Sequence, residues 1–179
     1  MKAATGANYA RICAKHNLPI SKNQIGDSGE KILGFALSYF PFFNLYFLDG
    51  KAPVEDFFGE IADETNPYPF LIQVKTTEKG VDAQGRLQAT LPKDKRIELV
   101  NRPVPTYLAG IGLHELKLYL CPVFDPSVAY SAIPPRHVID FDDLDLWADE
   151  LALLKRDVIQ FWSTHTNTPA VKPSYQSLL

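Results

Sequence analysis

The polar residues of this chain that suit catalytic chemistry lie in and around one apolar segment, residues 70–77. Gln73 and Lys75 are two positions apart in the segment FLIQVKTT, so in a β-strand their side chains point to the same face. A lysine on a buried face is costly without a counter-charge, and Asp56 lies a short distance upstream. A carboxylate, an amide and an ammonium group together suit metal-assisted hydrolysis of a phosphodiester bond.

The oxygen atoms of this group match the preferences of Mg²⁺, which binds one or two carboxylates and keeps positions open for water and phosphate. We expect the Asp56 carboxylate, the Gln73 amide oxygen and the Val74 carbonyl to form half of such a ligand shell. Lys75 would hold or deprotonate the attacking water and stabilise the developing charge. Glu30 borders the buried stripe of a predicted helix and completes the candidate set.

Two alternatives stay open from the residues alone. Glu55 competes with Asp56 as the acidic ligand, although strand parity favours Asp56, because Glu55 would share a face with Phe57. The second alternative is structural: Glu30 or Asp56 merely neutralises Lys75 in a buried ion pair, which contributes little net stability.

Hydrophobic periodicity predicts the elements that must position these residues. A capping box at Ser21–Gln24, with Ile20 and Ile25 as a hydrophobic staple, predicts the start of the first helix. One α/β domain with a mixed sheet is expected over residues 1–179. The predicted elements are a helix at 21–39, strands at 42–48, 54–61, 70–77 and 87–91, a short helix at 93–102, strands at 106–113 and 116–124, and a helix at about 142–163.

Two of the predicted helices have an expected buried face. Ile97 and Val100 are the expected inner residues of the short helix. In the last helix the expected apolar stripe, at helical spacing, is Leu144, Trp147, Leu151, Leu154, Val158 and Phe161.

The ordered set of motifs resembles the PD-(D/E)XK superfamily, which has the restriction-endonuclease-like fold. The similarity covers about residues 24–125, leaves a C-terminal helical extension at about 140–163, and points to a bacterial branch of uncharacterised domains. Gln73 stands where the superfamily usually has Glu, which removes one negative charge, and Pro53 lies three residues before Asp56 instead of next to it. The motifs are Gly29-Glu30, Pro53-Val54-Glu55-Asp56, Gln73-Val74-Lys75-Thr76 and Pro105-Thr106-Tyr107-Leu108.

This resemblance implies an αβββαβ core, Mg²⁺ or Mn²⁺ as cofactor, and cleavage of DNA, with phage defence or restriction as the setting. Asp56, Gln73 and Val74 would hold the metal, Lys75 would activate water, and Glu30 would support the site. The alternative is a catalytically inactive module of the same fold that binds nucleic acid or a protein partner. A homodimer or a partner protein of a defence system is a further expected partner.

The net charge of −3 is not that of a typical nucleic-acid binder, but the basic residues are clustered. Residues 1–26 contain Lys2, Arg11, Lys15 and Lys22 and no acidic residue, and residues 75–102 contain seven basic residues against four acidic ones. We expect Lys93, Lys95 and Arg96, with some of the N-terminal basic residues, to contact phosphates. The alternative is that both clusters are ordinary solvated surfaces.

Other sites find little support in the sequence. Cys13 and Cys121 form no CxxC pair, and the four histidines lack the spacing of a zinc site. No apolar run approaches the roughly 18 residues of a membrane span, and the N-terminal residues lack the apolar core of a secretory signal. These features predict a cytoplasmic protein with no membrane partner.

Overall fold

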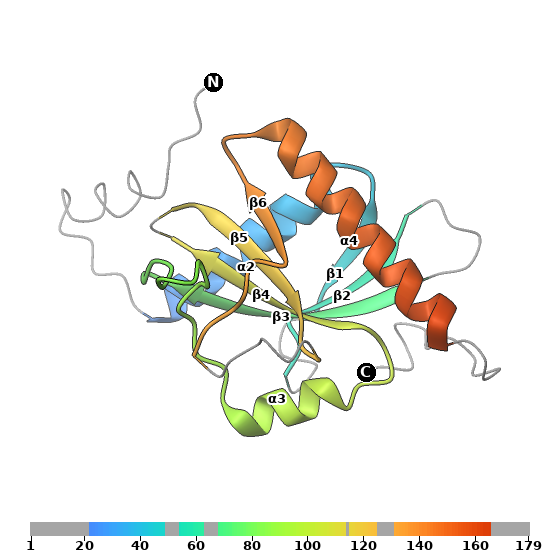
Figure 1. Ribbon diagram of the computed structural model, residues 1–179, viewed down its shortest axis with the longest axis horizontal. Coiled ribbons are helices and arrows are strands. Elements are labelled where there is room, and N and C mark those ends of the chain that lie inside the picture. Colours follow the sequence, from blue (N-terminus) through green and yellow to red (C-terminus); the bar gives the residue numbers. More distant parts are fainter. Residues whose placement is uncertain (1–21, 49–53, 63–67, 114, 125–130, 166–179) are drawn as a thin grey trace.

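In the computed structural model, the described residues are 22–48, 54–62, 68–113, 115–124 and 131–165, without the side chains of residues 22–24 and 165. They form a six-stranded mixed sheet with helices on both faces (Figure 1). The elements, in chain order, are α2 (Lys22–Ser38), β1 (Phe43–Phe47), β2 (Phe57–Ile61), β3 (Pro69–Thr77), α3 (Lys93–Val100), β4 (Thr106–Gly112), β5 (Lys117–Pro122), β6 (His137–Asp140) and α4 (Leu144–His165).

The strands lie side by side in the order of the sequence, from β1 to β6. All neighbours are antiparallel except β3 and β4, which are parallel with Lys75 opposite Gly110. A parallel pair needs a crossover connection, and α3 forms part of it. The α/β class and the mixed sheet are therefore as predicted from the sequence.

One face of the sheet carries the main core under α2 and α4, while α3 lies on the opposite face (Figure 1). α2 packs on β1, β3 and β4, and α4 packs on β6. The indole N–H of Trp147 donates a hydrogen bond to the Ala36 carbonyl of α2 at 3.1 Å, and that of Trp162 donates to the Pro69 carbonyl at 2.9 Å. Through these two bonds the last helix joins the central core.

Several predicted elements differ from the structure. Residues 87–91 are not a strand: Leu87 forms isolated bridges to Val81 and Ile133, and Leu87, Ala89 and Leu91 are buried in the core on the α3 side. The strand β6 is absent from the sequence prediction. Residues 54–56 precede β2, so Asp56 lies just before the strand that was expected to contain it.

The expected inner faces of two helices also need correction. Ile97 and Val100 are exposed, and the residue of α3 that is buried is Leu99. In α4, Leu144 is exposed in the first turn, and Trp162 is more deeply buried than Phe161. The residue that begins the predicted capping box, Ser21, lies outside the described residues.

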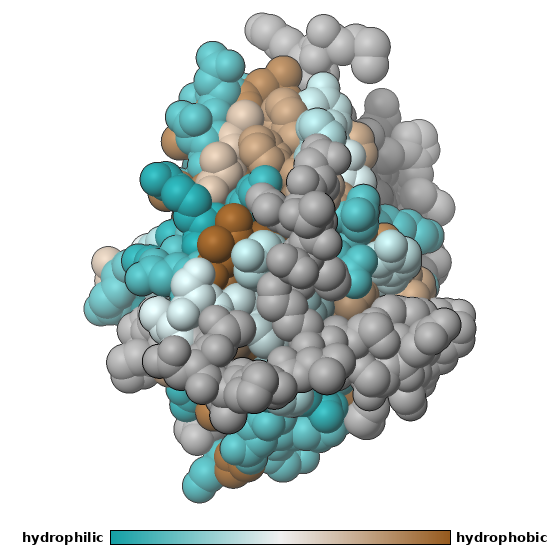
Figure 2. Space-filling view, turned by 90° about the vertical axis from the view of Figure 1, so that its right-hand side faces the viewer, coloured by the Kyte–Doolittle hydropathy of each residue, from teal (hydrophilic) through white to brown (hydrophobic). Residues whose placement is uncertain are grey.

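Some large apolar side chains reach the surface. Figure 2 shows hydrophobic residues at the surface of the side that lies to the right in Figure 1, with hydrophilic residues around them. Half-exposed aromatic residues include Phe35 of α2, Tyr39 just after the end of α2, and Tyr46 and Phe47 of β1. None of the described helices is both long enough and apolar enough to span a membrane.

Candidate active site

The alternation of β3 sends its side chains to two different faces of the sheet. Val74 belongs to the main core, and Thr76 lies against Gly29 of α2 on that same face. Gln73 and Lys75 therefore point to the other face, towards α3. Gln73 is buried and Lys75 is half-buried, so the pair expected from the sequence does share one face.

Asp56 meets this pair from the neighbouring chain segment. One of its carboxylate oxygens, Oδ2, accepts a hydrogen bond from the Gln73 amide nitrogen, and the Val74 backbone N–H donates to the same oxygen at 2.6 Å. The Gln73 amide nitrogen also donates to the Val74 carbonyl at 3.0 Å. The backbone N–H of Asp56 donates to the Ile72 carbonyl at 2.9 Å, which fixes the approach of Asp56 to β3.

The donor set is compatible with a divalent cation on one condition. The NH₂ group of Gln73 lies between the Asp56 carboxylate and the Val74 carbonyl, the two oxygens expected to bind metal. An amide nitrogen carries partial positive charge and donates two protons, so here it occupies the position that suits a cation. Rotation of the Gln73 amide would replace the nitrogen by its oxygen and give three oxygen ligands, which suits Mg²⁺. The residues therefore fit a metal, at the cost of these two hydrogen bonds.

Burial shifts the two ionisable groups of this site toward their neutral forms. Burial raises the pKa of Asp56, while the Val74 N–H and the charge of Lys75 act in the opposite direction. Burial lowers the pKa of Lys75, and the nearby charge of Lys95 adds to the lowering, whereas Asp56 and Glu30 oppose it. Opposed shifts of an acid and a base in one place are typical of functional sites, although structural ion pairs also produce them.

Glu30 approaches from the opposite face of the sheet, since it lies on α2. Its charge acts on Lys75, so the helix brings this carboxylate within electrostatic range of the site. The preceding residue, Gly29, explains how α2 comes so close to β3. A Cβ atom at Gly29 would lie 1.8 Å from the Thr76 hydroxyl oxygen and 3.0 Å from the Thr76 Cβ, so only glycine fits this contact.

We expect Gly29→Ala to lower the free energy of unfolding by about 1–3 kcal/mol through overpacking, even though alanine favours the helix. The Thr76 hydroxyl is buried without a hydrogen-bond partner among the described residues, so Thr76→Ala alone should change little. Urea unfolding of both single variants and of the double variant measures the coupling between the two positions. Strict additivity in the double variant would show that the two residues are not in contact.

Glu55 and Asp56 differ in the residues with which they pair. Glu55 is buried and pairs with Arg102, whose NH₂ group lies 3.0 Å from its second carboxylate oxygen. Arg102 also pairs with Glu98 at 3.3 Å. Residues 54–56 lie outside β2, so the parity rule used to separate the two carboxylates does not apply there. Glu55 binds Arg102, just after the end of α3, and of these two carboxylates only Asp56 accepts a hydrogen bond from Gln73.

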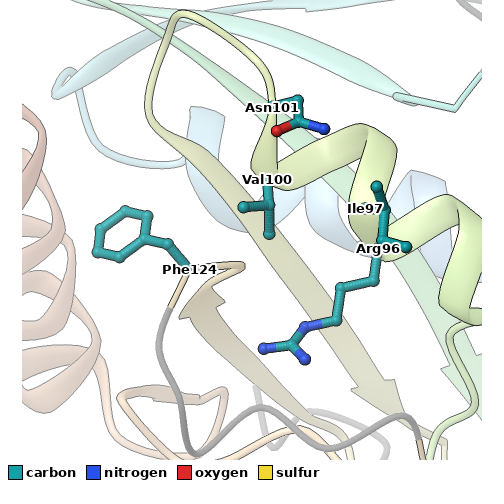
Figure 3. Close-up of a pocket in the computed structure, with 5 residues that line it drawn as sticks. All are labelled: Arg96, Ile97, Val100, Asn101 and Phe124. Atoms are coloured by element: carbon teal, nitrogen blue, oxygen red, sulfur yellow. The ribbon is translucent and has the colours of Figure 1, made fainter.

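The three predicted phosphate-binding residues of α3 have different surroundings. Lys95 acts electrostatically on Lys75, and it shares a helix stripe with the buried Leu99 by i+4 spacing. Arg96 lines a shallow hollow of about 290 Å³ with Val100 and Phe124 (Figure 3). Lys93 is exposed. Lys95 is therefore the member of the three that has a link to the candidate site.

Most of the N-terminal basic residues predicted to contact phosphate lie outside the described part of the chain. Lys2, Arg11 and Lys15 lie outside the described residues, as does the side chain of Lys22. Within the described part of the chain, no three His, Cys, Asp or Glu side chains lie together in a way that suits a metal ion. A metal at Asp56 would therefore depend on neutral oxygen ligands.

Sequence reasoning missed two features of this site. It did not find that Arg102 removes Glu55 from the candidate ligands, although an arginine after a short helix is a visible partner for a buried acid. It treated Gln73 only as an acceptor, whereas its nitrogen forms both hydrogen bonds.

No protein-family model, curated protein or solved structure matches this chain.

Proposed function

We propose that the protein is a metal-dependent nuclease with a restriction-endonuclease-like core that hydrolyses DNA phosphodiester bonds. The observation that carries this proposal is the meeting of Asp56, Gln73 and Lys75 on adjacent segments of one sheet face. The element order from α2 to β4 is αβββαβ, which supports the proposed core. Mg²⁺ or Mn²⁺ is the proposed cofactor, and phage defence or restriction is the proposed setting.

The chemistry rests on the residues around Lys75. A bound divalent cation supplies Lewis acidity toward the phosphoryl oxygen. Asp56, the Val74 carbonyl and the rotated Gln73 amide would hold it. Because burial lowers the pKa of Lys75, its neutral amine is more accessible and accepts a proton from the attacking water. The resulting ammonium group then lies near Asp56, whose negative charge favours it.

A second candidate function follows from the Gln73 amide. Its nitrogen already fills the position between Asp56 and Val74, so the site is satisfied without metal. In that case the protein is a nuclease-fold module without cleavage activity that binds nucleic acid or a protein partner. The two proposals differ in whether the Gln73 amide rotates.

Incubation of plasmid DNA with the protein and either Mg²⁺ or Mn²⁺ distinguishes the nuclease from the non-catalytic module. The nuclease proposal expects nicked or linear product that a chelator prevents and that Asp56→Ala abolishes in a folded protein. Calorimetric titration of each metal into the wild type runs in parallel. Neither cleavage nor metal binding by a folded wild-type protein would leave only the non-catalytic module.

For nucleic-acid binding, Lys95→Gln is the informative substitution. Each phosphate contact changes the slope of log affinity against log salt by about 0.9 for duplex DNA, so loss of one contact should reduce the slope by about 1. Fluorescence anisotropy of a labelled duplex at several salt concentrations measures this slope. Lys155→Gln on α4, which covers the opposite sheet face, is the matched control and should leave the slope unchanged. Equal slopes for the wild type, Lys95→Gln and Lys155→Gln would show that Lys95 does not contact a phosphate.

A further inference from the structure

The edge strand β1 differs from the other edge of the sheet in how it is protected. β6 is only four residues long, and it ends at Asp140, which pairs with Lys117 at 2.7 Å. β1 has the sequence FNLYF, with no charged residue, proline or glycine, and Tyr46 and Phe47 are 43% and 48% exposed. Native edge strands usually carry charges, prolines or bulges that prevent pairing with another strand. As far as the described residues show, β1 has none of these protective features, and an edge of this kind is suited to adding a strand.

The hydrogen bonds to β2 show which backbone groups of β1 point outward. The Phe42 carbonyl accepts from Ala62 N–H, and Leu48 N–H donates to the Asp56 carbonyl, each at 2.9 Å. In an antiparallel pair the direction of these groups alternates, so the even-numbered residues from 42 to 48 bond to β2. The N–H and C=O groups of Phe43, Leu45 and Phe47 therefore point away from the sheet.

These three residues are arranged symmetrically about Leu45, which favours a second copy of this chain as the added strand. An antiparallel pairing with a two-fold axis at Leu45 places Phe43 opposite Phe47 of the second copy, and Leu45 opposite itself. Phe43 and Phe47 lie on the α2 side of the sheet, since their rings contact Phe70 and Phe57 at centroid distances of 5.3 Å and 5.2 Å. Every cross-strand pair on that side is then apolar, and no like charges meet.

We infer that β1 forms the interface of a symmetric homodimer, in which two β1 strands pair antiparallel and join the two sheets. A two-fold interface uses the same surface of both subunits, as this pairing does. The inference does not depend on nuclease activity.

Sedimentation equilibrium over a range of protein concentrations gives the first test. The wild type should reach twice the 20.1 kDa mass of the chain. Leu45→Lys places two ammonium groups opposite each other only in the dimer, and it should weaken association about tenfold or more. Ile97→Lys changes an equally apolar but 52% exposed residue of α3 and should leave the dimer intact.

Mixing of Leu45→Lys with Leu45→Glu tests the two-fold pairing itself. Opposite charges at position 45 should restore a dimer that contains one copy of each, detected by native mass spectrometry. If circular dichroism shows that Leu45→Lys does not fold, Phe47→Lys replaces it as the test of dimer formation. The Phe47 side chain is half exposed in the single chain, so the fold should tolerate this substitution. A monomeric wild type, or a dimer that persists in the folded edge variant, would overturn the inference. A monomer that captures only a foreign strand would overturn it as well.

Discussion

In the proposed nuclease, Lys75→Met should lower the rate of phosphodiester cleavage about 10²–10⁴-fold and leave the fold intact. A positioned general base contributes about 10²–10⁴-fold in rate, and methionine has similar length but cannot accept a proton. Cleavage by the wild type should also rise with pH until it passes the lowered pKa of Lys75. Initial rates on plasmid DNA across a pH series, for wild type and variant, measure both effects.

The same variant distinguishes a catalytic lysine from a structural ion pair. Burial lowers the pKa of Lys75 in the folded protein below its value of 10.5 in the unfolded chain. The unfolded state then binds more protons between these two pKa values, so the free energy of unfolding rises with pH in that window. Lys75→Met removes this dependence and should keep or increase stability at neutral pH. A loss of several kcal/mol would instead indicate that Lys75 neutralises a buried carboxylate.

Gln73→Glu should make the stability of the protein strongly dependent on metal. The wild-type amide donates to Asp56 and to the Val74 carbonyl, and an ionised glutamate side chain at this position can do neither. Two lost hydrogen bonds and a second negative charge beside Asp56 should cost about 3 kcal/mol without metal at neutral pH. A divalent cation removes the repulsion, and at 100 times its Kd it restores about 2.7 kcal/mol. Chemical unfolding with and without Mg²⁺ measures both quantities.

The pH dependence of this variant has a defined sign. Two carboxylates in contact share a proton, so the folded pKa of the pair is raised above the unfolded values. The folded state then binds more protons, and stability is highest in acid and falls as the pH rises through the raised pKa. Acid should therefore substitute for metal in restoring stability.

The exchanged double variant, Asp56→Asn with Gln73→Glu, is the matched control. It again has one carboxylate and one amide, so its metal-free stability should lie close to that of the wild type. If Gln73→Glu binds no more metal than the wild type does, the cation site proposed at Asp56 is wrong, and only the non-catalytic module remains.

Residues with strong local patterns were predictable from the sequence. β3 combines a buried apolar run with alternation, and so its two faces and the pairing of Gln73 with Lys75 followed from residue spacing alone. The first helix was predictable from its capping box and hydrophobic staple, and the last helix from its long apolar stripe. The choice of Asp56 over Glu55 agrees with the contacts of Gln73, but for a different reason than strand parity.

The other elements depend on contacts that spacing does not encode. Residues 87–91 alternate like a strand, but Leu87, Ala89 and Leu91 are buried on the α3 side, and among the described residues only single bridges pair with this segment. The short α3 has one buried apolar residue, Leu99, and Arg102, just after its end, forms an ion pair with Glu55, which hydrophobic periodicity cannot reveal. β6 has only four residues after two prolines, too few for a periodic signal.

Because Glu55 and Asp56 are adjacent in the chain, they connect the end of α3 to the candidate site on β3. Glu55 is tied to α3 through Arg102, and the next residue holds Gln73 and Val74 through its carboxylate. A displacement of α3 is therefore transmitted across one peptide bond to the Asp56 carboxylate. If nucleic acid binds on α3 and a metal binds at Asp56, as we propose, this connection is a route by which the two affinities become thermodynamically coupled. Linkage requires that each ligand change the affinity of the other by the same factor.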